Sequence, residues 1–217
     1  MKEKCIIIVR HGALHNPSNI VYNRDSIMDP KDIIHLSDEG RHQIENMASV
    51  IRERNFVVTK ICSSPSIRAQ ESAQILKDML ELNNVVILDD LDDVFAPGPY
   101  IQGMTMDQLE AVGGNIYTDY WREKYQHESS QEIISRMLKV FWETVASLPM
   151  VGVAILVSHG DAIAWLIQSL NHDKHPSAEN LRDSDYPAKG EAVVVVIGED
   201  NGILKMEFLK QPNSQKY

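Results

Sequence analysis

Two short motifs that contain histidine stand far apart in this sequence. The first is Arg10-His11-Gly12 and the second is His159-Gly160. A neutral imidazole can act as a nucleophile or exchange protons near neutral pH, and a guanidinium offers a fork of N–H donors that matches phosphate oxygens. These residue types therefore indicate chemistry on an anionic compound such as a phosphate ester.

Each motif follows an apolar run that is typical of a buried β-strand. The runs are unbroken and rich in β-branched side chains: residues 5–9 (CIIIV) and 153–157 (VAILV). Strands that helices cover on both faces have this composition. Ligands of open α/β sheets bind beyond the carboxyl ends of the strands. We therefore expect His11 and His159 to meet at one edge of a sheet, whereas one histidine alone would indicate only a loop.

Arg68 is a further candidate for binding the same anion. The sequence predicts a strand over residues 57–62 and then a helix, with Ser64 as its N-cap and Pro65 in its first turn. A positive side chain in the first turn opposes the helix dipole unless an anion lies nearby. The position of Arg68 therefore favours a functional role.

Acidic residues cluster after the next expected strand, at residues 85–88. The cluster contains Asp89, Asp90, Asp92 and Asp93, and two prolines in residues 96–99 (APGP) predict an irregular loop behind it. Such a cluster is either a solvated loop or the source of a proton donor near the strand ends.

Strands that alternate with helices predict an α/β fold, a three-layer α/β/α sandwich with a mostly parallel sheet. Two further strands, at 192–197 and 203–208, are expected to form a closing hairpin. The expected helices begin after Ser37 and lie further on at about 65–80, 104–112, 117–126, 131–148 and 161–170. We expect residues 1–217 to form a single domain with a helical insertion or cap at about 94–130.

The composition argues against several classes of function. The net charge of −10 argues against non-specific nucleic-acid binding, and the sequence lacks the Gly-rich phosphate loop of nucleotide-dependent kinases. No apolar run approaches membrane-spanning length, so we expect a cytoplasmic protein with no signal peptide and no membrane partner. The sequence predicts no oligomeric state, and a homodimer stays open.

Other candidate ligands have simpler interpretations. His172 and His175 flank Asp173 but lack further ligands, so we predict no metal site there. Cys5 and Cys62 stand in apolar runs, which favours buried free thiols over a disulfide. Three tryptophans at apolar positions of expected helices are predicted to pack in the core: Trp121, Trp142 and Trp165.

Six segments together resemble the histidine phosphatase (phosphoglycerate mutase-like) superfamily. In chain order they are residues 10–12 (RHG), 36–43 (LSDEGRHQ), 63–69 (SSPSIRA), 103–105 (GMT), 128–129 (ES) and 157–160 (VSHG). The resemblance covers nearly the whole chain and implies a phosphoglycerate mutase-like fold. It also implies an enzyme that needs neither a metal nor another cofactor.

The resemblance assigns roles to the basic residues. His11 is expected to attack phosphorus in line and to form a phosphohistidine that water later hydrolyses. Arg10, Arg68 and His159 are expected to hold the equatorial phosphate oxygens and to neutralise their growing charge.

The expected proton donor departs from the family pattern. Asp93 stands where the family usually has a Glu, and the loop behind it is longer than usual. Asp92 and Asp90 therefore stay open as alternative donors. Asn16, in a substrate-facing loop, and Gly160 are expected to bind substrate.

The leading hypothesis is a phosphatase, a phosphomonoesterase that acts on a small phosphorylated metabolite. The alternatives are phosphoryl transfer of the phosphoglycerate mutase type and a catalytically weak phosphate-binding regulatory module, which the Asp in place of Glu motivates. Residues 211–217 after the last expected strand are few. This favours hydrolysis, because mutases of the family exclude water with longer insertions and an ordered tail.

Overall fold

The computed structural model describes most of the chain, namely residues 3–22, 24–95, 104–111, 117, 122–124, 126–171, 176–179, 181 and 186–211. Several predictions fall outside these residues: the loop at 96–99, the position of Trp121, and the His172 and His175 pair. The helix expected at 117–126 is described only in part, with residues 122–124 helical. The insertion or cap at about 94–130 therefore stays a prediction.

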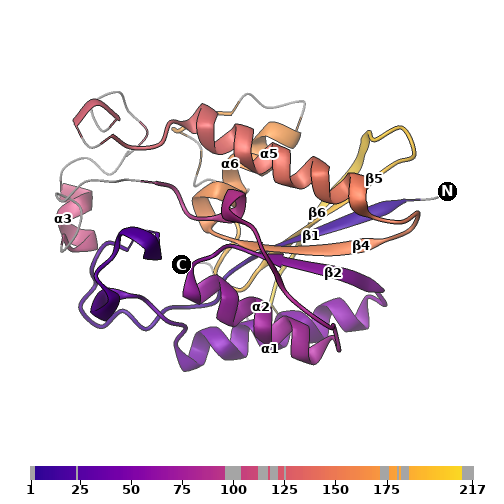
Figure 1. The fold of residues 1–217 in the computed structure, drawn as a ribbon, viewed down its shortest axis with the longest axis horizontal. Helices are drawn as coiled ribbons and strands as arrows, with labels where there is room; N and C mark the ends of the chain where they lie inside the picture. Colours follow the sequence, from indigo (N-terminus) through magenta and orange to yellow (C-terminus); the bar gives the residue numbers. More distant parts are fainter. Residues whose placement is uncertain are drawn as a thin grey trace.

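Within the described residues, a six-stranded sheet with the order β3-β2-β4-β1-β5-β6 forms the middle layer (Figure 1). The strands are β1 (Lys4–Arg10), β2 (Val58–Ser63), β3 (Val86–Ile87), β4 (Val153–Ser158), β5 (Ala192–Ile197) and β6 (Ile203–Leu209). β1 to β4 run parallel, β5 pairs antiparallel with β1, and β6 pairs antiparallel with β5. The mostly parallel sheet is thus confirmed.

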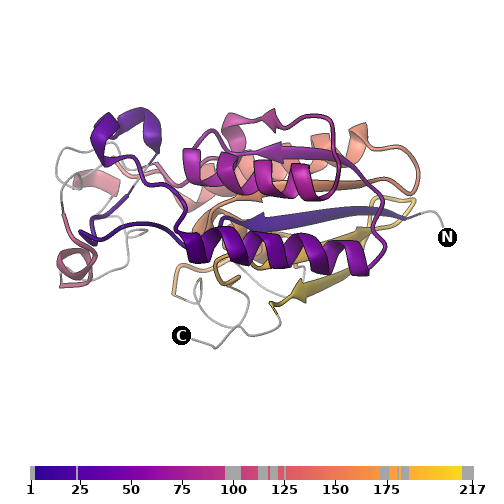
Figure 2. The ribbon, with the colours of Figure 1, turned by 90° about the horizontal axis from the view of Figure 1, so that it is seen from below.

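Helices cover both faces of the sheet (Figures 1 and 2). On one face lie α1 (Asp38–Glu53) and α2 (Ile67–Met79), and on the other lie α5 (Ser130–Ser147) and α6 (Gly160–Leu170). Side chains alternate along β1 as in any strand: Ile6 and Ile8 belong to the core under α5 and α6, and Ile7 and Val9 to the core over α1 and α2. The three-layer sandwich predicted from the alternation of strands and helices is confirmed.

The start of α2 differs from the prediction. Ser66, not Ser64, is the N-cap residue, and Pro65 lies before the helix. The start of α1 is as expected, since Ser37 Oγ accepts a hydrogen bond from the Gly40 N–H at 3.1 Å. Ser64 is consequently available for another contact.

Short helical elements lie beyond the carboxyl ends of β1 and β4 (Figure 1). They include the 3₁₀ turns at Asp25–Ile27 and Pro30–Asp32 and the helix α3 (Met106–Ala111). A third 3₁₀ turn, Asp89–Leu91, follows β3 and holds the first part of the acidic cluster. These elements surround the edge where the two histidine motifs were expected.

The remaining predictions about the core can be compared directly with the structure. Cys5 and Cys62 are buried free thiols, and Trp165 and Trp142 pack in or against the core on the α5 and α6 side. The described residues contain no group of three potential metal-ligating side chains. In the described part of the chain, no helix combines the length and apolar character needed to cross a membrane.

Candidate active site

His11 and His159 lie side by side at the ends of two neighbouring central strands. β1 and β4 pair in register, with Arg10 opposite Ser158, so the next residue of each strand emerges at the same level. The two ring centroids are 5.2 Å apart at an interplanar angle of 61°. Each histidine is only 1% exposed. The structure therefore brings together the two imidazoles that the strand pattern predicted to meet.

The imidazole of His11 is held by its own backbone. Nδ1 lies 2.8 Å from the carbonyl oxygen of Gly12, and because a carbonyl can only accept, Nδ1 carries the proton and Nε2 keeps a lone pair. Burial lowers the pKa of His11 well below 6.5, and the neighbouring positive charges of Arg68 and Arg10 lower it further. His11 is therefore neutral at neutral pH and has a free nucleophilic nitrogen.

Two glycines allow the backbone after β1 to approach the backbone at the start of α1 closely. A Cβ added to Gly12 would overlap the carbonyl oxygen of Gly40, and a Cβ on Gly40 would overlap that of Ala13. The N-terminal turn of α1 is thereby packed directly against the strand end that presents His11.

The guanidinium of Arg68 is fully buried between two carboxylates. Nη1 donates to Asp25 Oδ1 at 3.1 Å, and Nη2 donates to Asp93 Oδ2 at 2.9 Å. Its Cζ also lies 5.1 Å from the ring centroid of Tyr22, and Asp25 Oδ2 accepts the Ile67 N–H at the start of α2. The protein's own carboxylates thus provide the anions that the position of Arg68 in the first helical turn requires.

His159 is held by side chains from other segments. Nε2 lies 2.8 Å from Ser64 Oγ, and Nδ1 lies 3.3 Å from Asp93 Oδ2. Burial lowers the pKa of His159 well below 6.5, and the charge of Arg68 adds to this shift. Ser64 Oγ is also 3.0 Å from Asp92 Oδ1. Ser64 thus links two parts of the site.

The acidic cluster divides into distinct environments. Asp90 pairs with Lys139 Nζ at 2.7 Å near the surface. Asp92 Oδ1 accepts hydrogen bonds from two serine hydroxyls and from the next backbone N–H, so it is engaged behind the site. Asp93 instead directs Oδ2 between Arg68 and His159. Of these three candidate donors, the geometry favours Asp93.

Arg10 and Gly160 meet around a tyrosine. Arg10 Nη1 donates to the Pro187 carbonyl at 3.0 Å, and its Cζ lies 5.0 Å from the ring centroid of Tyr186. The Tyr186 hydroxyl donates to Asp161 Oδ1 at 2.7 Å. A Cβ on Gly160 would overlap that hydroxyl and would lie 2.9 Å from Arg10 Cζ. Gly160 therefore provides room for Arg10 and Tyr186, and a contact of Gly160 with substrate stays a prediction.

Asn16 is engaged within its own loop. Its Nδ2 donates to the Ile20 carbonyl at 2.8 Å, and its Oδ1 accepts the Ile20 N–H at 3.1 Å. Both ends of the amide thus close the turn at residues 16–20. The expected substrate contact of Asn16 stays a prediction.

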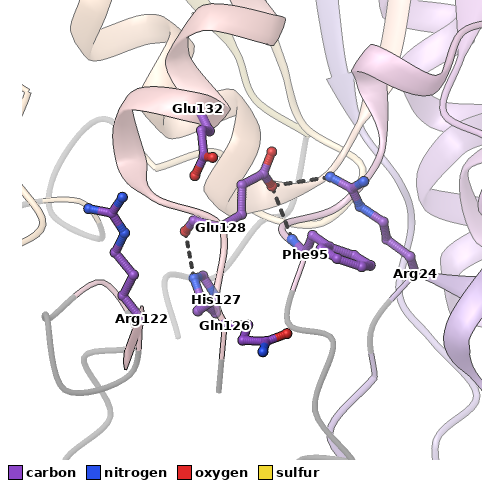
Figure 3. Close-up of a pocket in the computed structure, with 7 residues that line it drawn as sticks. All are labelled: Arg24, Phe95, Arg122, Gln126, His127, Glu128 and Glu132. Carbon is purple, nitrogen blue, oxygen red and sulfur yellow. Dashed lines mark hydrogen bonds and ion pairs between the residues drawn. The ribbon is translucent and has the colours of Figure 1, made fainter. Parts of the chain in front are cut away.

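A cavity of about 390 Å³ lies beside this site (Figure 3). Its described lining consists of Arg24, Phe95, Arg122, Gln126, His127, Glu128 and Glu132. The cavity adjoins the segment after Asp93, because Arg24 Nε donates to the Asp93 carbonyl at 2.7 Å. The two arginines and two glutamates of this lining were not expected from residue chemistry, although Glu128 belongs to one of the six segments that resemble the family.

Comparisons with known proteins agree with this arrangement. The family model described as the histidine phosphatase superfamily (branch 1) matches residues 6–202. The broad-specificity phosphatase YOR283W of Saccharomyces cerevisiae is 24% identical over 183 residues, which are 78% of this chain and 71% of that protein. A 2,3-bisphosphoglycerate-dependent phosphoglycerate mutase of Parvibaculum lavamentivorans is 21% identical over 94% of this chain and 95% of its own length.

A similar architecture occurs among solved structures. The mycobacterial glucosyl-3-phosphoglycerate phosphatase Rv2419c superposes with a TM-score of 0.73 at 21% identity, covering 98% of this chain and all of that one. The structural match shows the shared fold, and the family match extends over both histidine motifs. The chain therefore belongs to the histidine phosphatase superfamily, branch 1.

Proposed function

We propose that this protein is a phosphomonoesterase that hydrolyses a small phosphorylated metabolite through a phosphohistidine on His11. The observation that carries the proposal is the convergence of two neutral, buried imidazoles with Arg68 and Arg10 at one edge of the sheet. Such an arrangement suits a tetrahedral anion, because the guanidinium forks match phosphate oxygens and the site excludes water.

The first step transfers the phosphoryl group to the enzyme. Nε2 of His11 attacks phosphorus as the bond to the ester oxygen breaks, and Arg10, Arg68 and His159 hold the equatorial oxygens. Asp93 gives its proton to the departing oxygen, which leaves as an alcohol. The Asp93 carboxyl must therefore carry a proton when the transfer begins.

The second step releases inorganic phosphate. The Asp93 carboxylate takes a proton from water, and the resulting hydroxide attacks phosphorus as the bond to Nε2 breaks. His11 regains its lone pair and Asp93 regains its proton. All roles in this cycle fall on side chains, so we expect activity to be insensitive to EDTA.

Phosphoryl transfer of the mutase type is the second candidate. The specific observation in its favour is the similarity to the phosphoglycerate mutase over 94% of this chain. Hydrolysis is favoured by the similarity to a broad-specificity phosphatase and to a glucosyl-3-phosphoglycerate phosphatase. Incubation with 3-phosphoglycerate and a trace of 2,3-bisphosphoglycerate separates the two, since a mutase forms 2-phosphoglycerate and a phosphatase releases phosphate.

Hydrolysis of p-nitrophenyl phosphate tests the proposal directly. Wild-type protein is expected to turn over this ester, and His11→Ala is expected to lose turnover by at least about 10⁴-fold, because no nucleophile remains. Asp93→Asn is expected to keep much of it, since p-nitrophenolate leaves without a proton. Equal activity of wild type and His11→Ala would overturn the proposal, and absence of turnover in the wild type would favour the regulatory module.

A further inference from the structure

Three charged side chains surround the backbone that presents Asp93. They are Arg24, from the loop after β1, Glu128, from the segment just before α5, and Arg136, from within α5. We refer to them as the Asp93 clamp. None of the three contacts His11 through a described hydrogen bond or ion pair, and the cycle proposed above gives none of them a part in phosphoryl transfer.

The two arginines of the clamp bind backbone carbonyls of the acidic cluster. Arg136 Nη1 lies 2.8 Å from the carbonyl oxygens of both Asp90 and Asp92, and Nη2 lies 3.3 Å from that of Asp93. Arg24 Nε donates to the Asp93 carbonyl at 2.7 Å. Consecutive peptide groups on either side of Asp93 are therefore held by charged donors.

Glu128 joins the arginines to each other and to the segment behind Asp93. Its Oε1 accepts from Arg136 Nε at 2.7 Å, and its Oε2 accepts from Arg136 Nη2 and Arg24 Nη2, each at 3.1 Å. The same Oε2 accepts the Phe95 N–H at 3.0 Å, and Figure 3 shows both this bond and the bond to Arg24. The Glu128 N–H donates in turn to the Phe95 carbonyl at 2.7 Å.

This degree of fixation exceeds what an ordinary surface loop needs. Hydrogen bonds between ionised groups and backbone are stronger than neutral ones and restrict geometry. A proton donor must lie within hydrogen-bond reach of the leaving oxygen, and displacement by about 1 Å can cost about 10²-fold in rate. Asp93 follows a single 3₁₀ turn, so regular secondary structure does not fix it.

We propose that Arg24, Glu128 and Arg136 are positioning residues that hold the Asp93 carboxyl at the leaving-group side of the phosphate. The inference rests on the proposed function, because it assigns these residues to the proton-transfer step alone. It predicts a selective defect, which grows as the leaving group becomes more basic.

The test compares two esters of nearly the same shape, p-nitrophenyl phosphate and phenyl phosphate. Phenolate is the more basic leaving group and depends more on a proton donor. Arg136→Met keeps an unbranched, flexible side chain at this position but removes every donor. We expect it to lower kcat for phenyl phosphate by about 10- to 100-fold and kcat for p-nitrophenyl phosphate by less than about 3-fold. Both reactions use His159, so an effect of Arg136 on His159 should lower kcat for both esters alike. The ratio of the two kcat values is therefore insensitive to such an effect.

Lys139→Met is the matched control. Lys139 lies on the same helix and binds the same acidic cluster, through an ion pair between its exposed side chain and Asp90. Its loss should leave both activities within about 2-fold of wild type, because exposed ion pairs contribute little. Glu128→Gln, which keeps the shape of the side chain, should reproduce the selective defect of Arg136→Met and serves in its place if that variant does not fold.

A double-mutant cycle with Asp93→Asn gives the decisive result. If the clamp acts through Asp93, adding Arg136→Met to Asp93→Asn should lower phenyl phosphate turnover by no more than about 2-fold further. Additive losses, or equal losses for both esters in the single variant, would overturn the inference. Loss of p-nitrophenyl phosphate turnover in His11→Ala would uphold the proposed function even then. Retention of turnover in His11→Ala would overturn the proposed function and, with it, the positioning role of the Asp93 clamp.

Discussion

The two histidine and glycine steps lie at neighbouring strand ends, yet their imidazoles are held in opposite ways. His11 is fixed by the carbonyl of Gly12, the next residue in the chain. His159 is fixed by Ser64 and faces Asp93, both of which lie far away in sequence. The same short motif therefore produces a self-contained imidazole with a free Nε2 in one case. In the other it produces an imidazole whose orientation depends on the tertiary structure.

This difference supports a division of labour between the two rings. A nucleophile needs an unshared electron pair and a fixed tautomer, and the local contact of His11 supplies both. A residue that stabilises phosphate oxygens needs alignment with other donors. His159 meets this need because it lies beside Arg68 and Asp93.

The largest expected effect comes from removing the two imidazoles one at a time. His11→Asn should lower turnover by at least about 10⁴-fold and should abolish the acid-labile phosphoenzyme in rapid-quench labelling. His159→Asn should lower turnover by about 10²- to 10³-fold, as for loss of one oxyanion donor, and should still form the labelled intermediate. Labelling of His11→Asn but not of His159→Asn would reverse the assignment.

The two glycines should differ in their effect on stability. Gly12→Ala forces a methyl group against the backbone of Gly40, whereas Gly160→Ala meets the side chains of Tyr186 and Arg10. Backbone atoms at a helix start cannot move away cheaply, so we expect Gly12→Ala to lower the free energy of unfolding by about 3 kcal/mol and Gly160→Ala by about 1 kcal/mol. Urea unfolding followed by far-UV circular dichroism measures both. Equal losses would show that the two strand ends are equally rigid.

The last expected effect concerns pH. Both histidines have a folded-state pKa well below 6.5, so the unfolded chain binds protons more strongly as the pH falls. Stability is therefore retained above pH 6.5 and lost below it, by up to about 1.4 kcal/mol per histidine between pH 7.5 and 5.5. His11→Asn and His159→Asn should each flatten this dependence in urea titrations at the two pH values. An unchanged dependence would mean that the rings titrate normally in the folded protein.

The parts of the fold that depend on local pattern were predictable. The apolar runs at 5–9 and 153–157 predicted β1 and β4, and the rule for strand ends predicted that His11 and His159 would meet. Apolar spacing after Ser37 likewise predicted α1. In each case the signal lies within a few residues of the feature that it predicts.

The supports of the site were not predictable, because they are contacts between remote segments. Ser64 looked like a helix cap, yet its hydroxyl contacts His159, 95 positions away. Asp25 lies in an irregular loop, and nothing near it in the sequence indicates that it binds Arg68. Asp90, Asp92 and Asp93 are alike as residues, and only the packing around each of them separates their environments.

The central position of β1 and β4 also determines at which stage of unfolding His11 and His159 separate. Ile6 to Val9 of β1 and residues 154–157 of β4 are fully buried in the middle of the sheet, so their amide protons should exchange with solvent only through global unfolding. Fraying of an outer helix turn or of the hairpin edge would leave the two rings in place. Heat should therefore separate the two rings only at the cooperative melting of the whole sheet.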